Sequence, residues 1–188
     1  TKRMLMQKDQ DFSTVTSPIL QDLPRVDMGD YRSLVDFVKW SVQNFPAKKY
    51  MIIVWNHGMG WHGVPEEKME VLDISSDDIS GNAITTVQLG VAMEQSAKLM
   101  GHKVDLYGSD ACSMASLEVA TEMKDSVQYF LGSEELEGSE GWDYHRFLLN
   151  LANRPTADAL ELGKFVADTY LESNPDGGEM GGVTFSVI

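Results

Sequence analysis

The sequence predicts an α/β fold in which a mostly parallel central sheet lies between helices. Residues 50–55 and 127–132 are apolar runs, which is typical of strands buried on both faces, and residues 103–107 alternate polar and apolar side chains. Segments with helical spacing precede and follow these strands, in the order that builds parallel sheets. A chain of 188 residues is long enough for one domain with a sizeable core.

The first quarter of the chain is expected to lead into the sheet through one helix. Residues 3–7 are predicted to form a short strand, and residues 11–25, which include two Pro, an exposed loop. Asp30 is a candidate N-cap for a helix over residues 31–44, whose apolar side chains recur at helical spacing. The buried strand at 50–55 comes next.

The middle of the chain combines polar connections with a second helix. Residues 62–70 are predicted to be a polar connection and residues 73–82 a surface loop. That loop has the acids of a calcium-binding loop but not its spacing, because the sixth residue counted from Asp73 is Asp78 rather than Gly. Calcium binding is therefore only an alternative there. Thr85 or Thr86 is expected to cap a helix over 87–100.

The last third is expected to hold two more strands and three helices. A helix is predicted over residues 116–124, a short one over 147–151, and a longer one over 157–173 with Thr156 as its cap. Between the first two, residues 133–144 form an acidic loop with aromatics that is placed to line a pocket. Residues 182–188 are predicted to be a final strand.

The charge of the chain limits the classes of partner. There are 29 acidic and 15 basic residues, a net charge of −14. This disfavours nucleic acid and anionic membrane surfaces, which attract basic patches, and it is compatible with cationic peptides or with a merely solubilising surface. The single cysteine excludes an intrachain disulfide, and no apolar run reaches the roughly 18 residues of a membrane span.

That single cysteine, Cys112, lies between the predicted strand at 103–107 and the predicted helix at 116–124. Unpaired N–H groups at a helix start would stabilise a thiolate and favour a nucleophile. The plainer interpretation is a buried core cysteine. His57 follows the buried strand at 50–55 and is placed to face a cleft at the carboxyl edge of the sheet, although a histidine merely satisfied at a strand end is the alternative. Together they suggest a nucleophile and its base.

Two segments resemble the His and Cys motifs of the clostripain-like cysteine peptidases, family C11, in the clan of caspases, gingipains, legumain and separase. They are Asn56-His57-Gly58-Met59-Gly60-Trp61 and Asp110-Ala111-Cys112-Ser113-Met114-Ala115. Residues 26–30, 132–135 and 141–144 also fit, so the likeness runs from about residue 22 to the end. Met59 departs from the small residue that is common there.

The resemblance implies a caspase-like α/β/α sandwich. Residues 1–188 would be a single peptidase domain that is incomplete at both ends, because such proteins usually begin with another strand and helix and continue past the final strand. Cys112 would attack the scissile carbonyl and His57 would act as general acid and base, as a dyad without a third acid. The N–H groups of Gly58 and Cys112 would form the oxyanion hole.

Substrate preference is expected to depend on Asp110, two residues before the nucleophile. A carboxylate there favours Arg or Lys at P1, which agrees with the preference of clostripain-like peptidases; capping the next helix is the alternative role. Glu134, Glu135 and Trp142 are weaker candidates for substrate binding, the alternative being a solvated acidic loop and a packing aromatic. The expected partners are peptides or proteins with Arg or Lys at P1.

Several further expectations follow from the resemblance and the remaining residues. Lys68 is a candidate self-cleavage site, no cofactor is required apart from the calcium alternative, and the spacing of His62, His102 and His145 predicts no zinc site. An extracellular or cell-envelope location in a bacterium is implied. The competing hypotheses are a catalytically silent domain that binds basic peptides in an acidic cleft, and another thiol hydrolase on the same fold.

Overall fold

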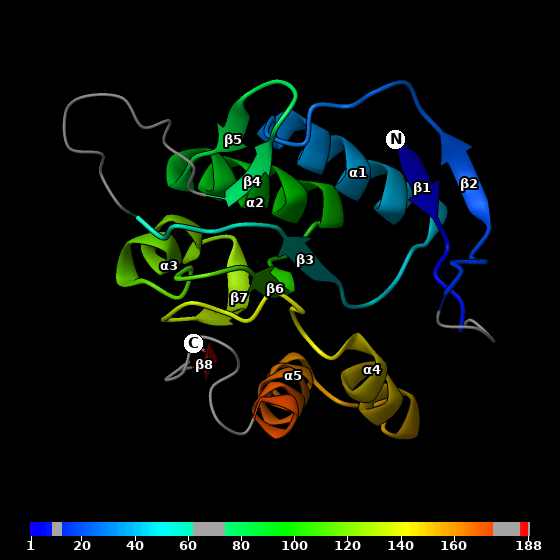
Figure 1. Ribbon diagram of the computed structural model, residues 1–188, viewed down its shortest axis with the longest axis vertical. Coiled ribbons are helices and arrows are strands. Elements are labelled where there is room, and N and C mark those ends of the chain that lie inside the picture. The colour runs from blue at the N-terminus through cyan, green and yellow to red at the C-terminus, as the bar shows by residue number, and fades with distance from the viewer. Residues whose placement is uncertain (9–12, 62–73, 175–184, 188) are drawn as a thin grey trace.

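The computed structural model describes residues 1–8, 13–61, 74–174 and 185–187 (Figure 1). Its central sheet has the strand order β3-β6-β7-β8. β3 (Met51–Trp55), β6 (Val104–Asp110) and β7 (Val127–Ser133) are parallel, and β8 (Phe185–Val187) pairs antiparallel with β7 at the edge. The predicted mostly parallel sheet is confirmed.

Five helices cover the two faces of this sheet in the described part of the chain (Figure 1). α1 (Tyr31–Asn44), α2 (Thr86–Met100) and α3 (Leu117–Met123) lie on one face, and α4 (Tyr144–Asn153) and α5 (Ala159–Ser173) lie on the other. Side chains alternate across a strand, so β6 sends Tyr107 into the first core and Leu106 into the second. The expected α/β/α sandwich is present. No helix within the described residues is both long and apolar enough to cross a bilayer.

Local capping explains where most of the helices begin and end. Asp30 accepts a hydrogen bond from the N–H of Arg32 at the start of α1, and Thr85 forms a capping box with Gln88 at the start of α2. Gly101 ends α2 in the left-handed conformation, with φ 77°. Thr156 is not the cap of the last helix: Asp158 accepts the N–H of Glu161, and α5 begins at Ala159.

Two small antiparallel strand pairs lie outside the central sheet. β4 (Ile74–Asp77) pairs with β5 (Asn82–Ile84) where a surface loop was expected, and β1 (Lys2–Met4) pairs with β2 (Ile19–Asp22). β1 overlaps the strand expected at residues 3–7, whereas β2 lies in the segment expected to be a loop. β2, β4 and β5 are only three or four residues long, too short for a periodic pattern that would predict them. α4 is likewise longer than the predicted turn at 147–151.

Candidate active site

The register of the sheet brings two segments side by side at the same edge of the sheet. They are the His segment, residues 56–61, and the Cys segment, residues 110–115. Trp55 at the end of β3 pairs with Asp110 at the end of β6. One residue later the N–H of Asn56 donates to the carbonyl oxygen of Asp110 over 3.4 Å. His57 and Cys112 therefore leave neighbouring strands side by side, at the carboxyl edge where α/β folds place their sites.

Two glycines let the backbones of these segments touch. A Cβ on Gly58 would lie 2.6 Å from the carbonyl oxygen of Cys112, and one on Gly60 would lie 2.5 Å from that of Ser113. Gly60 also has φ 61°, a conformation that side chains disfavour. The close approach places His57 and Cys112 on one cavity of about 430 Å³.

Cys112 is not at a helix start, which corrects the expected source of thiolate stabilisation. α3 begins at Leu117 with Ser116 as its cap. The intervening backbone instead keeps pairing with the chain after β7, through Ser113 N–H to Glu135 O and Ala115 N–H to Ser133 O, each 2.9 Å. The Cys112 sulfur accepts the backbone N–H of Glu137 over 3.3 Å. The loop after β7 therefore holds the thiol.

The β4–β5 hairpin supports the residue that precedes His57. Both the N–H and the hydroxyl of Ser76 donate to Asn56 Oδ1 at 3.0 Å. Gly58 forms an isolated antiparallel bridge with Ile74. The hairpin thus contacts Asn56 and Gly58, the residues immediately before and after His57.

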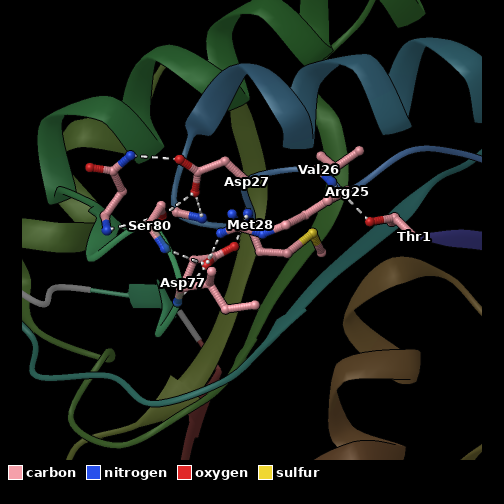
Figure 2. A network of polar contacts seen from close by, with 10 residues as sticks. Thr1, Arg25, Val26, Asp27, Met28, Asp77 and Ser80 are labelled. Atoms are coloured by element: carbon pink, nitrogen blue, oxygen red, sulfur yellow. Dashed lines mark hydrogen bonds and ion pairs between the residues drawn. The ribbon is translucent and has the colours of Figure 1, made fainter.

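Asp77 and Asp27 fasten this hairpin to the segment before α1 (Figure 2). Asp77 accepts hydrogen bonds from the N–H groups of Ile79, Ser80 and Met28 and from the Arg25 guanidinium, over 2.9–3.0 Å. These bonds, that from Ser80 foremost, hold the pKa of Asp77 well below its usual range.

Asp27 accepts from Ser80 Oγ at 2.9 Å and Asn82 Nδ2 at 2.5 Å, and Gly29 packs against the Asn82 backbone. Of the acids that suggested calcium, Asp77 therefore binds protein donors, and Asp73 lies outside the described residues. Among the residues that the structure describes, no group of three or more His, Cys, Asp or Glu is arranged to hold a metal ion.

Two buried carboxyl groups line the cavity beside Cys112. Asp110 is 2 % exposed and its Oδ2 accepts the N–H of Trp142 at 3.2 Å and the hydroxyl of Tyr144 at 2.8 Å, so it does not cap α3. Glu137 is 8 % exposed and its Oε1 accepts Trp142 Nε1 at 3.4 Å. Burial raises the pKa of Asp110. Burial and then the charge of Asp110 raise the pKa of Glu137 to about 9.

The other predicted pocket residues lie elsewhere. Glu134 and Glu135 are exposed and do not line the cavity. Trp142 is 3 % exposed and belongs to the core, where a Cβ on Gly108 would meet its ring at 2.5 Å. Glu137 was missed, because nothing in the spacing of the acidic loop distinguishes it from its acidic neighbours. Lys68 and His62 lie outside the described residues.

A sandwich with a His segment and a Cys segment at adjacent strand ends defines the class of caspase-like α/β folds. A family model for the clostripain family, Peptidase C11, matches residues 2–188, and the chain belongs to that family. The motifs around His57 and Cys112 resemble those of the same family, so motif and family model agree.

Solved structures with the same fold come from the same family. One is a secreted C11 cysteine protease from Bacteroides thetaiotaomicron in complex with an irreversible peptide inhibitor, 20 % identical, with a TM-score of 0.72 over 93 % of this chain and 45 % of that one. Another is an inactive zymogen C11 protease from Parabacteroides distasonis, 18 % identical, with a TM-score of 0.66 over 95 % of this chain and 45 % of that one. The chain thus spans less than half the length of either structure. A search of curated proteins finds no match.

Proposed function

We propose that this chain is the catalytic part of a cysteine endopeptidase that cleaves peptide bonds after Arg or Lys. One observation carries the proposal: the buried carboxyl groups of Asp110 and Glu137 line the same cavity as Cys112 and His57. A nucleophile, a base and an anionic pocket are the parts that such a reaction needs. Membership of the clostripain family supports it.

In the proposed reaction His57 takes the proton of the Cys112 thiol, and the sulfur attacks the scissile carbonyl carbon. The C–N bond breaks, His57 gives the proton to the leaving amine, and a thioester remains with the acyl part of the substrate. His57 then accepts a proton from the attacking water, the C–S bond breaks to release the carboxylic acid, and the proton returns to the Cys112 sulfur. The N–H groups of Gly58 and Cys112 stabilise the oxyanion. The contact of the Gly58 position with the Cys112 backbone supports this pairing of donors.

The proposed specificity follows from charge and burial. A cationic side chain in the cavity would neutralise carboxylates that are removed from water, whereas an acidic side chain would be repelled. No Lys or Arg is among the described residues that line this cavity. The substrate itself would therefore bring the positive charge.

The test is hydrolysis of fluorogenic peptides that end in Arg, Lys, Asp or Leu by the full chain, beside Cys112→Ala and Asp110→Asn. We expect turnover of the Arg and Lys peptides alone. It should be lost in Cys112→Ala and weakened by more than tenfold in kcat/KM in Asp110→Asn, the loss of a charge-assisted contact. Equal turnover of the Leu peptide would contradict the specificity. Parallel assays with calcium and with a chelator test the need for that ion.

We further propose that the protein matures by cleaving itself after Lys68. The residue lies in the stretch between the His segment and β4, and one solved relative is described as an inactive zymogen. Intact mass spectrometry should find two fragments that meet at Lys68 in the active protein and a single chain in Cys112→Ala. An uncut, fully active chain would rule the proposal out.

We also propose that the protein works outside the cytoplasm of a bacterium, because the C11 protease of Bacteroides thetaiotaomicron whose solved structure is similar to this chain is described as secreted. Its partners would then be extracellular peptides or proteins with Arg or Lys at P1. Fractionation of the source cells with antibody detection tests this, and confinement to the cytoplasmic fraction would contradict it.

A further inference from the structure

We propose that Asp110 and Glu137 act as one acid pair, which shares a single proton in the free protein and releases that proton when a cationic side chain binds. The inference rests on the proposed function and adds a residue, Glu137, and a pH-dependent step to it. Glu137 would thereby be a specificity-determining residue alongside Asp110.

The hydrogen bonds around Asp110 require a proton between the two groups. Its Oδ1 is buried and receives no hydrogen bond from any N–H or hydroxyl of the described residues. The Glu137 carboxyl is the buried acidic neighbour of Asp110: both line the same cavity, and Trp142 donates to both, through its backbone N–H to Asp110 and its Nε1 to Glu137. Two ionised carboxylates cannot hydrogen-bond to each other, so a hydrogen bond between this pair requires one of them to carry a proton.

The neighbouring groups indicate which carboxyl holds the proton. The hydroxyl of Tyr144 and the N–H of Trp142 both donate to Asp110 Oδ2 and stabilise its anion. The hydrogen bond that the Glu137 side chain accepts within the described residues is a long one, 3.4 Å from Trp142 Nε1. Burial and the Asp110 charge raise the pKa of Glu137 to about 9, which agrees with Glu137 as the protonated member near neutral pH.

Other titratable groups surround the acid pair, and they come from the elements that pack against it. Tyr144 from α4 faces Asp110, and Tyr170 from α5 accepts the N–H of Gly138 beside Glu137. Burial raises the pKa of both tyrosines, so they stay neutral over the working range. Cys112 and His57 line the same cavity, and among the described lining residues no Lys or Arg supplies a countercharge.

Binding of a cation changes this balance. A guanidinium or ammonium donates hydrogen bonds to both carboxylates, the O–H bond of Glu137 breaks, and its proton passes to water. The pair goes from one negative charge to two, and the ligand adds one positive charge. Because one proton leaves for each cation bound, the association constant should rise by up to about tenfold per pH unit until Glu137 is ionised in the free protein.

Glu137 also connects this pair to the nucleophile through its backbone. Its N–H donates to the Cys112 sulfur over 3.3 Å, and its carbonyl oxygen lies 3.9 Å from the same sulfur. A substitution that changes only the side chain leaves these backbone contacts in place. Glu137→Gln is therefore a specific test, since glutamine has nearly the same shape and cannot release a proton.

The experiment measures the binding of benzamidine, a cationic amidine that does not react with thiols, to the full chain by isothermal titration calorimetry. Titrations between pH 6 and 9 in two buffers of different ionisation enthalpy give the number of protons released. We expect close to one proton per benzamidine near pH 7. Glu137→Gln should release none and bind with an affinity independent of pH. Glu140→Gln, an exposed site in the same loop, should behave as the parent protein.

The outcomes separate this inference from the proposed function. If the protein turns over Arg peptides but binds benzamidine without releasing a proton, the proposal of a proton-sharing acid pair is wrong. The proposed peptidase function is then unaffected. Absence of both turnover and benzamidine binding in the folded full chain would overturn the two together. The pH dependence of the parent protein alone decides the matter if Glu137→Gln fails to fold.

Discussion

Gly58 allows the segment that carries His57 to pack directly on the backbone of Cys112. The His-Gly-x-Gly-Trp pattern marks the segment, and the structure adds that the glycine faces the Cys112 backbone. That contact joins residues far apart in the chain, so no local propensity reports it. Cys112 illustrates the same limit: the sequence singled out its thiol as a candidate nucleophile, but the thiol contacts the Glu137 backbone rather than a helix start.

Gly58→Ala should disrupt the contact between the two segments. Its Cβ would lie 2.6 Å from the Cys112 carbonyl oxygen and 2.9 Å from Ala111 Cβ, so the backbones must separate. Overpacking of this kind costs about 1–3 kcal/mol of unfolding free energy. Urea unfolding should report that loss, and alkylation of Cys112 by iodoacetamide should change in rate.

Gly138→Ala is the matched control for Gly58→Ala, because the nearest atom to its Cβ would be Asn174 Oδ1 at 3.8 Å. The control should unfold close to the parent midpoint. Equal stability of the Gly58 variant and the control would contradict the tight packing of the His and Cys segments.

Glu137 should make the protein less stable as the pH rises. Burial, the largest cause, raises the pKa of its carboxyl from the ordinary value of 4.5 to about 9 in the folded protein. Between these values the folded state binds more protons, so the free energy of unfolding falls with increasing pH. Glu137→Gln should show a shallower fall between about pH 5 and pH 9 in denaturant titrations. Parallel curves for parent and variant would contradict the buried acid.

At the scale of elements, the helices were predictable and the β4–β5 hairpin was not. Helices α1 and α2 have capping residues and apolar periodicity in the sequence, and both begin within one residue of the expected position. The β4–β5 hairpin is held by side chains from residues 25–29 and by Asn56 instead. Such support depends on tertiary contacts, and the polar sequence therefore looked like a loop.

Asp77→Asn should weaken the support of His57 through the hairpin. The new amide N–H group would face donors, the Met28 N–H and the Arg25 guanidinium among them. We expect kcat for an Arg peptide to fall several-fold with little change in KM, because the carboxyl pair does not contact the hairpin. Steady-state kinetics measures both constants.

Asp78→Asn, at the exposed neighbouring position, is the control for Asp77→Asn and should match the parent. A rise in KM with kcat unchanged would contradict the positioning role of the hairpin. A fall in kcat together with a rise in KM in the Asp78→Asn control would point to a general effect of the lost charge.

At the scale of the whole molecule, the loop over residues 133–144, which lines the cavity, packs into the hydrophobic core between the sheet and helices α4 and α5. Trp142 packs on Gly108 of β6 and in the core that α4 and α5 close. The sequence left this tryptophan either as a weak candidate for substrate contact or as a packing aromatic, since an aromatic in an acidic loop fits both roles. Its burial shows instead that the loop is anchored through the sheet, which holds Asp110 and Glu137 in place.

Trp142→Ala should destabilise the entire domain rather than the loop alone. Replacing a buried Trp by Ala costs about 3–5 kcal/mol, and the Glu137 carboxyl would lose the indole N–H at the same time, while the backbone N–H of residue 142 could still donate to Asp110. Thermal unfolding followed by circular dichroism measures the loss. Leu148→Ala, at a position 50 % exposed on α4, should change stability by less than about 0.5 kcal/mol. A smaller loss for Trp142→Ala than for Leu148→Ala would contradict this anchoring.

The central claim is that Cys112 is a nucleophile beside a pocket for cationic side chains, and covalent labelling tests it most directly. Peptidyl chloromethylketones that end in Arg, Lys, Asp or Leu are incubated with the full chain, and the adducts are located by peptide mass spectrometry. The chain has one cysteine, so thiol labelling has one possible site. We expect a single adduct on Cys112 from the Arg and Lys reagents, slowed in Asp110→Asn. Equal labelling by the Leu reagent would contradict the claim. So would the absence of labelling by all four reagents in a correctly folded protein.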